Sequence, residues 1–279
     1  MGVKSMPAFI RYTGSKNTIA PIIARVIRST GGTCLVDLFG GSAAVLLKSG
    51  YDKRIYNDAN GDLVNLFRVM ANREQRRELL FCLKNLPLSR KIFDDDHEAY
   101  RAAGKSFCRT ADPVERARQT FYRHALCFGG KIPDGGFQTS CGSTKTIKEL
   151  SKYRATLRSF HEFGQFFRDT IMEHLDFAEC IKKYHTRKQV VIFADPPYPE
   201  VQEYYAHPFC IADHVYLAEQ LTSCQCPVVA TFYENDTVRE LYPESRWVYK
   251  RVTAPRNSSD LRKVKERKHT ELILTKRTQ

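Results

Sequence analysis

The sequence lacks the features that mark a membrane, secreted or metal-bound protein. Its longest apolar runs are far too short to span a bilayer, and no charged-then-apolar leader opens the chain. Nine cysteines are scattered without a paired pattern, and Cys224-Gln225-Cys226 has one intervening residue where zinc knuckles and redox motifs usually have two. The histidines show no metal-ligand spacing. We therefore expect a soluble cytoplasmic protein without a membrane segment, a disulfide framework or a metal.

Acidic residues are in the minority. The 279 residues include 44 Lys and Arg against 31 Asp and Glu, a formal net charge of +13, and residues 246–279 carry 11 basic against three acidic side chains. Clustered positive charge favours a surface that follows phosphates, so a polyanionic partner is the first hypothesis and a solvated basic face is the alternative. Hydrophobic residues at 42% and charged residues at 27% are typical of a folded chain.

Glycine turns divide the first part of the chain into a βαβ pattern. Residues 34–39 are apolar apart from Asp37 and lie between two glycine pairs, which predicts a buried strand that ends in a tight turn. A helix over 42–49, a strand over 54–58 and a second helix with apolar residues between 63 and 70 follow. Strand, glycine turn, helix and strand in this order indicate the start of an α/β domain.

The middle of the chain has a different character. Between about residues 76 and 168, basic residues are interleaved with aromatics, and the turn-rich run Gly129–Phe137 predicts a protruding loop. Short alternating elements then return, with predicted strands at 170–172, 190–194, 228–232, 247–253 and 270–275 and predicted helices at 177–184 and 212–223. The pattern predicts an α/β core interrupted by a helical insertion.

A tetrapeptide, Asp195-Pro196-Pro197-Tyr198, follows the most apolar strand. Two prolines cannot continue a strand ladder, so the chain must leave the sheet at its carboxyl edge, where open α/β sheets place their ligands. Asp37 precedes the glycine turn at the end of an earlier strand, and Asp58 ends the next one, where a carboxylate can accept both hydroxyls of a ribose. Each feature alone also fits an ordinary turn or helix cap; together they describe an adenosyl cofactor site.

These residues carry a resemblance. The chain resembles Dam-type N6-adenine-specific DNA methyltransferases, the alpha group or D12 class of amino-methyltransferases. The similarity rests on five matches in the family's order: Tyr12-Thr13-Gly14-Ser15-Lys16, Phe39–Ser42, Asp58, Asp176-Phe177 and Asp195–Tyr198. Ala43 departs from the family's third small glycine step, and the middle segment lacks the Asn-x-x-Arg pattern associated with reading GATC.

The resemblance implies a Rossmann-like methyltransferase core, a seven-stranded mixed sheet formed by residues 1–75 and 169–279, with a helical target-recognition insertion over 76–168. It implies S-adenosylmethionine as cofactor, with Lys16 holding the methionine carboxylate and Tyr12 packed beside the cofactor. The full set of expected cofactor-binding residues is Tyr12, Lys16, Asp37, Phe39, Gly41, Asp58, Asp176, Phe177 and Asp195.

The implied reaction explains the residue types in the tetrapeptide. The exocyclic amine of adenine is a poor nucleophile because its lone pair is delocalised into the ring. Asp195 and the Pro196 carbonyl can accept hydrogen bonds from that amine and localise the lone pair. Because the base is stacked inside a duplex it must be flipped out, and Tyr198 offers an aromatic face for it.

Duplex DNA is the expected partner, and no prediction of oligomeric state follows. The expected DNA-contacting residues are Arg118, Arg123, Lys131 and Lys145 in the insertion and Arg262 and Lys263 in the basic C-terminal stretch. The alternatives are N4 methylation of cytosine, an RNA substrate, and a catalytically silent nucleic-acid-binding module. The intact tetrapeptide favours an enzyme over the last, and the resemblance places it in a bacterial cytosol or a phage genome.

Overall fold

A seven-stranded sheet organises the protein. The computed structural model describes residues 6–128, 135–138, 148–198, 209–255 and 268–277. The strands are β1 Cys34–Asp37, β2 Lys53–Asn57, β3 Thr170–Glu173, β4 Val190–Ala194, β5 Val228–Tyr233, β6 Trp247–Pro255 and β7 Lys268–Lys276. They lie in the order β3-β2-β1-β4-β5-β7-β6. The first five strands in this order, β3, β2, β1, β4 and β5, are parallel to one another. Strand β7 is antiparallel to both β5 and β6, which confirms the predicted mixed sheet.

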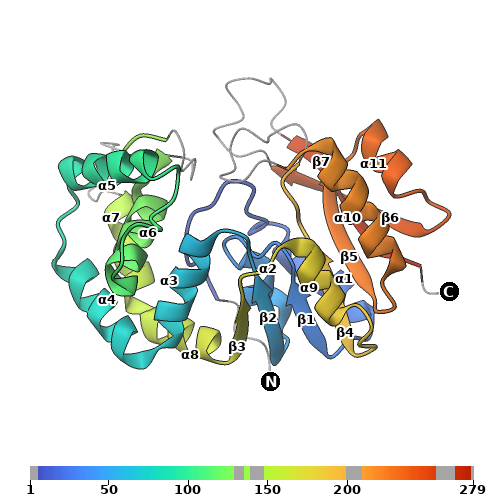
Figure 1. The fold of residues 1–279 in the computed structure, drawn as a ribbon, viewed down its shortest axis with the longest axis horizontal. Helices are drawn as coiled ribbons and strands as arrows, with labels where there is room; N and C mark the ends of the chain where they lie inside the picture. The colour runs from blue at the N-terminus through green and yellow to red at the C-terminus, as the bar shows by residue number, and fades with distance from the viewer. Residues whose placement is uncertain (1–5, 129–134, 139–147, 199–208, 256–267, 278–279) are drawn as a thin grey trace.

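Helices cover both faces of the sheet (Figure 1). They are α1 Ala20–Ser29, α2 Ala44–Ser49, α3 Gly61–Ala71, α4 Arg73–Asn85, α5 Arg90–Ala102, α6 Pro113–Leu126, α7 Lys148–Arg158, α8 Phe160–Arg168, α9 Phe177–Tyr184, α10 Ile211–Ser223 and α11 Asp236–Leu241. Adjacent strand residues point to opposite faces, so Val191 packs with α1, α2, α3 and α8 while Ile192 packs with α9, α10 and α11. Because β4 is buried on both faces, its sequence is a continuous apolar run.

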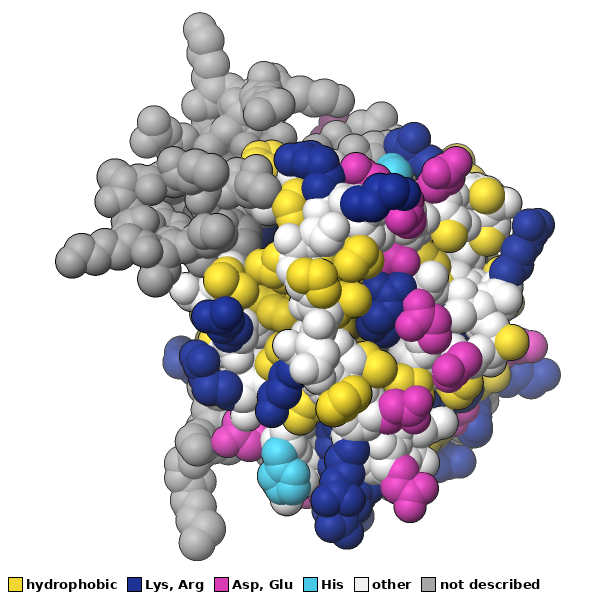
Figure 2. Space-filling view, turned by 90° about the vertical axis from the view of Figure 1, so that its left-hand side faces the viewer, with side chains coloured by type: hydrophobic (Ala, Val, Ile, Leu, Met, Phe, Trp, Pro, Cys, Tyr) yellow, Lys and Arg dark blue, Asp and Glu magenta, His cyan; other side chains and the backbone are white. Residues whose placement is uncertain are grey.

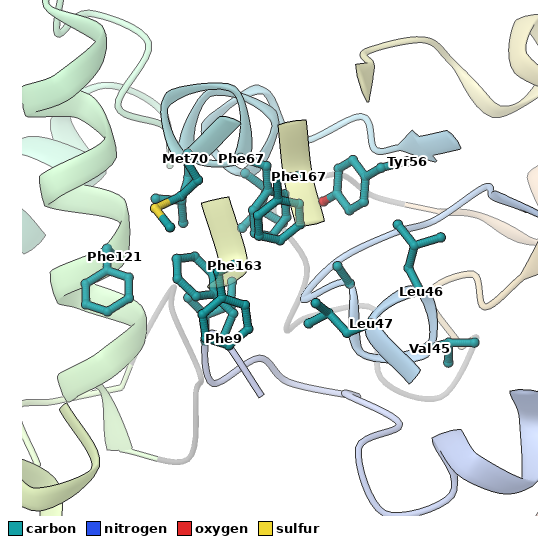
Figure 3. Packing of buried hydrophobic residues seen from close by; sticks show 14 of the residues in the cluster. Phe9, Val45, Leu46, Leu47, Tyr56, Phe67, Met70, Phe121, Phe163 and Phe167 are labelled. Carbon is teal, nitrogen blue, oxygen red and sulfur yellow. The ribbon is translucent and has the colours of Figure 1, made fainter. Parts of the chain in front are cut away.

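Six of the described helices, α3 to α8, lie between β2 and β3 in the chain, and most of them extend to one end of the sheet (Figure 1). Phe9 of the N-terminal segment joins this helical part to the sheet. Its ring lies 4.7 Å from that of Phe163, 5.4 Å from Phe121 and 5.8 Å from Phe167 (Figure 3). The helices therefore share one apolar core with the sheet's face. The boundary of a target-recognition unit at 76–168 stays a prediction.

The outer face of the helical part is mixed in character. Figure 2 shows apolar side chains gathered near its middle, with basic and acidic side chains around them. Phe81 of α4 is strongly exposed, and a groove between α4 and α7 is lined by leucines together with Tyr153 and Arg154. The described part of this face presents no continuous basic surface. None of the described helices is long and apolar enough to cross a bilayer.

Candidate active site

One cavity lies where the carboxyl ends of the parallel strands meet. It measures about 210 Å³ and is bordered by the turns after β1 and β2, the N-terminal segment, the start of α9 and the end of β4. All nine expected cofactor-binding residues line it: Tyr12, Lys16, Asp37, Phe39, Gly41, Asp58, Asp176, Phe177 and Asp195. Residues more than 180 positions apart in the chain thus meet at the sheet edge that the βαβ pattern indicates.

The glycine turn after β1 is fixed from both sides. A Cβ on Gly40 would lie 2.8 Å from Cζ of Tyr56 and closer still to two other ring atoms, so only glycine fits there. The Tyr56 hydroxyl donates to the Gly41 carbonyl at 2.8 Å. Asp58 accepts the Gly41 N–H at 2.7 Å and the Asn60 N–H at 2.7 Å. Asp58 therefore braces the turn through backbone amides, in addition to facing the cavity.

Asp37 supplies an unusual acid at the cavity wall. It is buried, and Oδ1 has no hydrogen-bond partner among the described residues. Burial raises the pKa of Asp37 well above its ordinary value, and the charges of Asp195 and Asp58 raise it further. A buried carboxyl oxygen without a partner is costly, so this oxygen is a natural position for a ligand's ammonium or hydroxyl group.

Three aromatic rings form the apolar wall of the cavity. The ring centroid of Phe39 lies 5.9 Å from that of Phe177 and 5.8 Å from that of Phe209, and the latter two are 5.5 Å apart. Asp176 caps α9 by accepting the Ala178 N–H at 2.9 Å, which fixes where Phe177 begins the helix. Aromatic faces in contact with a cavity suit a flat heterocycle such as adenine.

Asp195 opens toward the cavity from the end of β4. Its side chain is 18% exposed, and its Oδ1 accepts the Thr231 hydroxyl at 2.8 Å and lies 3.2 Å from Lys16 Nζ. Burial raises the pKa of Asp195, the ammonium of Lys16 opposes this rise, and the carboxylate of Glu271 adds to it. The acid is thus held in a defined orientation rather than left as a solvated loop residue.

Lys16 lines the cavity, but its ammonium is already paired with acids of the chain. It lies 2.8 Å from Glu271 Oε1 as well as 3.2 Å from Asp195 Oδ1, and 4.5 Å from the ring centroid of Tyr198. Holding a methionine carboxylate stays a prediction for this residue. The structure adds a contact with Asp195 that the sequence did not suggest.

Tyr198 differs from its expected role. Its ring is 4% exposed, with Lys16 near one face and the ring of Tyr233 4.4 Å away in an edge contact. The hydroxyl donates to Glu271 Oε1 at 2.6 Å and lies 3.2 Å from Asp195 Oδ1. The expectation of an open stacking face is therefore wrong for this structure, because neighbouring side chains bury the ring.

Sequence comparison decides the family. The family described as D12 class N6 adenine-specific DNA methyltransferase matches residues 12–254. The chain belongs to this family. A DNA adenine methylase of Serratia marcescens is 26% identical over 95% of this chain and 98% of its own length. A DNA adenine methylase of Escherichia coli K12 is 22% identical over 88% and 87% of the two chains. The DNA N-6-adenine-methyltransferase of phage P1 is 25% identical over 90% of this chain and 33% of its own.

Two predicted DNA contacts of this methyltransferase are wrong. Arg118 is buried and forms a bidentate pair with Asp96, at 2.7 and 2.8 Å, with a further contact to Glu115. Arg123 is 0% exposed, and its guanidinium lies 4.6 Å from the ring centroid of Tyr100. Both side chains support the helical part from inside, where they cannot reach a phosphate. The other four predicted contacts, Lys131, Lys145, Arg262 and Lys263, lie outside the described residues.

Two residues beside Asp195 and Lys16, Thr231 and Glu271, were not among those predicted from the sequence. Glu271 stands next to the apolar run 272–274 of β7, and Thr231 stands inside the apolar strand β5. A polar side chain in an otherwise apolar strand is the signal that could have identified both. Among the described residues, no group of three or more His, Cys, Asp or Glu side chains is placed to hold a metal ion.

Proposed function

We propose that this protein transfers a methyl group from S-adenosylmethionine to N6 of adenine in duplex DNA. The observation that carries the proposal is the meeting of Asp195 with the glycine turn, Asp37 and the aromatic wall at one cavity. Membership of the D12 class supports the adenine and DNA assignments. The names of the DNA adenine methylases of Serratia marcescens and Escherichia coli agree with it.

The residues of the cavity fit this cofactor. The apolar wall that Phe39 and Phe177 form suits an adenine ring packed against it. Asp58 lines the cavity at the end of β2, where a carboxylate could receive ribose hydroxyls. The unpartnered oxygen of Asp37 could receive an ammonium. When bound there, S-adenosylmethionine would supply an electrophilic methyl group.

The protein's own side chains and backbone are proposed to orient the substrate amine and to localise its lone pair. Asp195 stands at the cavity edge with one oxygen already engaged, so it can accept a hydrogen bond from an amine without reorganising. The Pro196 carbonyl is the proposed second acceptor. Two acceptors on one amine draw its lone pair out of conjugation and fix its direction. Because adenine N6 is paired inside a duplex, base flipping is part of the proposal.

The test is methyl incorporation by wild type and Asp195→Ala. Tritiated cofactor and duplex DNA free of N6-methyladenine are the substrates, and the digested product is separated into nucleosides. We expect label in N6-methyladenine and a loss of about 100-fold or more in the variant, because a preorganised acceptor is removed. Asp169→Ala, at an exposed acid paired with Arg168, is the matched control and should retain activity. Circular dichroism checks that each variant is folded.

Two results would overturn the proposal. Label found in N4-methylcytosine, or transfer to RNA and not to DNA, would replace the substrate. A folded Asp195→Ala protein with near wild-type turnover would remove Asp195 from the mechanism.

A further inference from the structure

We propose that Glu271 is a positioning residue for Asp195: it anchors Lys16 and Tyr198 so that Asp195 Oδ1 is occupied and Oδ2 is the oxygen left for the substrate amine. The inference rests on the proposed function, since it assigns the oxygen that the amine would meet. It concerns a side chain on β7, and none of the residues described in that strand lines the cavity.

The position of Glu271 is unusual for a carboxylate. It is 1% exposed and stands on β7 opposite Tyr233 of β5. Its Oε1 lies 2.8 Å from Lys16 Nζ and accepts the Tyr198 hydroxyl at 2.6 Å. Burying a charge is costly unless it is paired and hydrogen-bonded, and here both conditions are met. Lys16 and Tyr198 also both contact Asp195, which distinguishes this cluster from an ion pair that only supports the fold.

The two oxygens of Asp195 are in different situations. Oδ1 accepts the Thr231 hydroxyl at 2.8 Å and lies 3.2 Å from the Lys16 ammonium. The Tyr198 hydroxyl also lies 3.2 Å from Oδ1, but it has one hydrogen, and its nearer acceptor is Glu271. Within the described chain, the side-chain hydrogen bonds of Asp195 and its closest approach to Lys16 all involve Oδ1, and the side chain is partly exposed toward the cavity. Oδ2 is therefore the oxygen available to an incoming amine.

Glu271 is what keeps the ammonium on one side of Asp195. A lysine side chain is flexible and carries a compact charge that can move between the oxygens of a carboxylate. With a second carboxylate at 2.8 Å, Lys16 stays between the two acids, and its closest approach to Asp195 is to Oδ1. Without that second charge, the attraction toward Glu271 is lost, and the ammonium could move over Oδ2 of Asp195 and compete with the substrate.

The pKa of Asp195 is a second, independent measure of the role of Glu271, because it depends on the charges around Asp195. The ionisable groups that face it are Lys16 from the N-terminal segment, Glu271 from β7, Tyr198 from its own turn and Asp37 from β1. Glu271 raises the pKa of Asp195 and Lys16 lowers it. Removing the charge of Glu271 should therefore lower the pKa of Asp195. A residue that only fills space would leave this pKa unchanged.

The experiment compares Glu271→Gln with the matched control Glu173→Gln. Glu173 of β3 also accepts from a lysine and a tyrosine, Lys183 at 2.6 Å and Tyr184 at 2.6 Å, but none of the three contacts Asp195. For Glu271→Gln we expect kcat to fall by about 10- to 100-fold with KM nearly unchanged, because the acceptor is misplaced rather than removed. In the plot of kcat against pH, the acid limb of Glu271→Gln should move to lower pH than in wild type. Glu173→Gln should match wild type in both respects.

A spectroscopic titration separates this inference from the proposed function. Carbon NMR of protein labelled at aspartate carboxyls, assigned with Asp195→Ala, follows the pKa of Asp195 without any turnover. If wild type proves inactive on DNA, the proposed function fails, while a lower pKa of Asp195 in Glu271→Gln still supports the coupling between the two acids.

Further outcomes are decisive in either direction. Wild-type kcat together with an unchanged pKa of Asp195 in Glu271→Gln would overturn the inference. If Glu271→Gln does not fold, Glu271→Asp is the variant to use. It keeps the negative charge, but its shorter side chain cannot reach both Lys16 and Tyr198. That variant should lose kcat without a shift of the acid limb, and full activity in it would equally overturn the inference.

Discussion

Gly40 provides a sharp test of how the floor of the cavity is built. In Gly40→Ala the new Cβ would stand 2.8 Å from Cζ of Tyr56 and closer to two further ring atoms. The Tyr56 ring cannot move aside easily. It is fully buried, packs edge-on against Phe67 at 4.9 Å, and donates its hydroxyl to the Gly41 carbonyl. We therefore expect the glycine turn, not the ring, to shift.

The size of the effect follows from two contributions. Forcing an extra carbon into a packed site costs about 1–3 kcal/mol. Displacing the Tyr56 hydroxyl from the Gly41 carbonyl adds about 1 kcal/mol for a lost buried hydrogen bond. Stability should therefore fall by about 2–4 kcal/mol. Because the displaced turn also carries the Gly41 N–H bound by Asp58, affinity for S-adenosylmethionine should fall by about 10-fold or more, which corresponds to about 1.4 kcal/mol.

The assays are urea unfolding and calorimetric titration of the cofactor. Gly136→Ala is the control, since a Cβ there would meet no atom of the described residues within 4 Å. Tyr56→Leu supplies the second half of a double-mutant cycle: if the ring causes the clash, the two substitutions together should cost less than the sum of the single effects. Gly40→Ala protein with wild-type stability and cofactor affinity, or strictly additive costs in the cycle, would refute the reasoning.

Two further predictions concern buried side chains outside the cavity. Arg118→Ala leaves Asp96 buried without its bidentate partner and should lower the free energy of unfolding by about 3–5 kcal/mol; normal stability with weakened DNA binding would instead restore Arg118 as a DNA contact. Burial lowers the pKa of His214 to about 4. As pH falls from about 6.5 toward 4, the imidazole of the unfolded chain binds a proton that the folded protein does not bind, so the free energy of unfolding decreases. In urea unfolding, His214→Leu should reduce this decrease between pH 7 and 4.5 by about 2 kcal/mol. An unchanged decrease would show that His214 is not held neutral by burial.

The parts of the site that could be predicted depend on local chemistry. A proline pair ends a strand wherever it stands, and a glycine pair after an apolar run makes a tight turn, so Asp195 and Gly41 could be placed at strand ends from sequence alone. Parallel strands then bring such ends to one edge of the sheet. The nine cavity residues follow from these rules together with the family resemblance.

The wrong predictions have a common physical cause. Whether an arginine faces solvent or the interior depends on partners that are distant in the chain, and charge alone does not reveal them. Arg118 finds Asp96 on another helix 22 positions away. Arg123 lies among the rings of Phe93, Tyr100 and Phe107. Aromatics interleaved with basic residues suggested a nucleic-acid surface, yet the same composition also forms cation–π contacts inside a helical bundle.

The contacts of Asp195 show why the site cannot be understood from its tetrapeptide alone. Its Oδ1 is held by Thr231 from β5 and by Lys16 from the N-terminal segment, and Lys16 is held in turn by Glu271 from β7. Strand β7 is the last in the chain, yet it lies between β5 and β6 in the sheet. The orientation of Asp195 therefore depends on the pairing of the last strand with β5. Because Glu271 and Tyr233 share one register position in that pair, a shift of one residue would turn the Glu271 side chain to the opposite face of the sheet and away from Lys16.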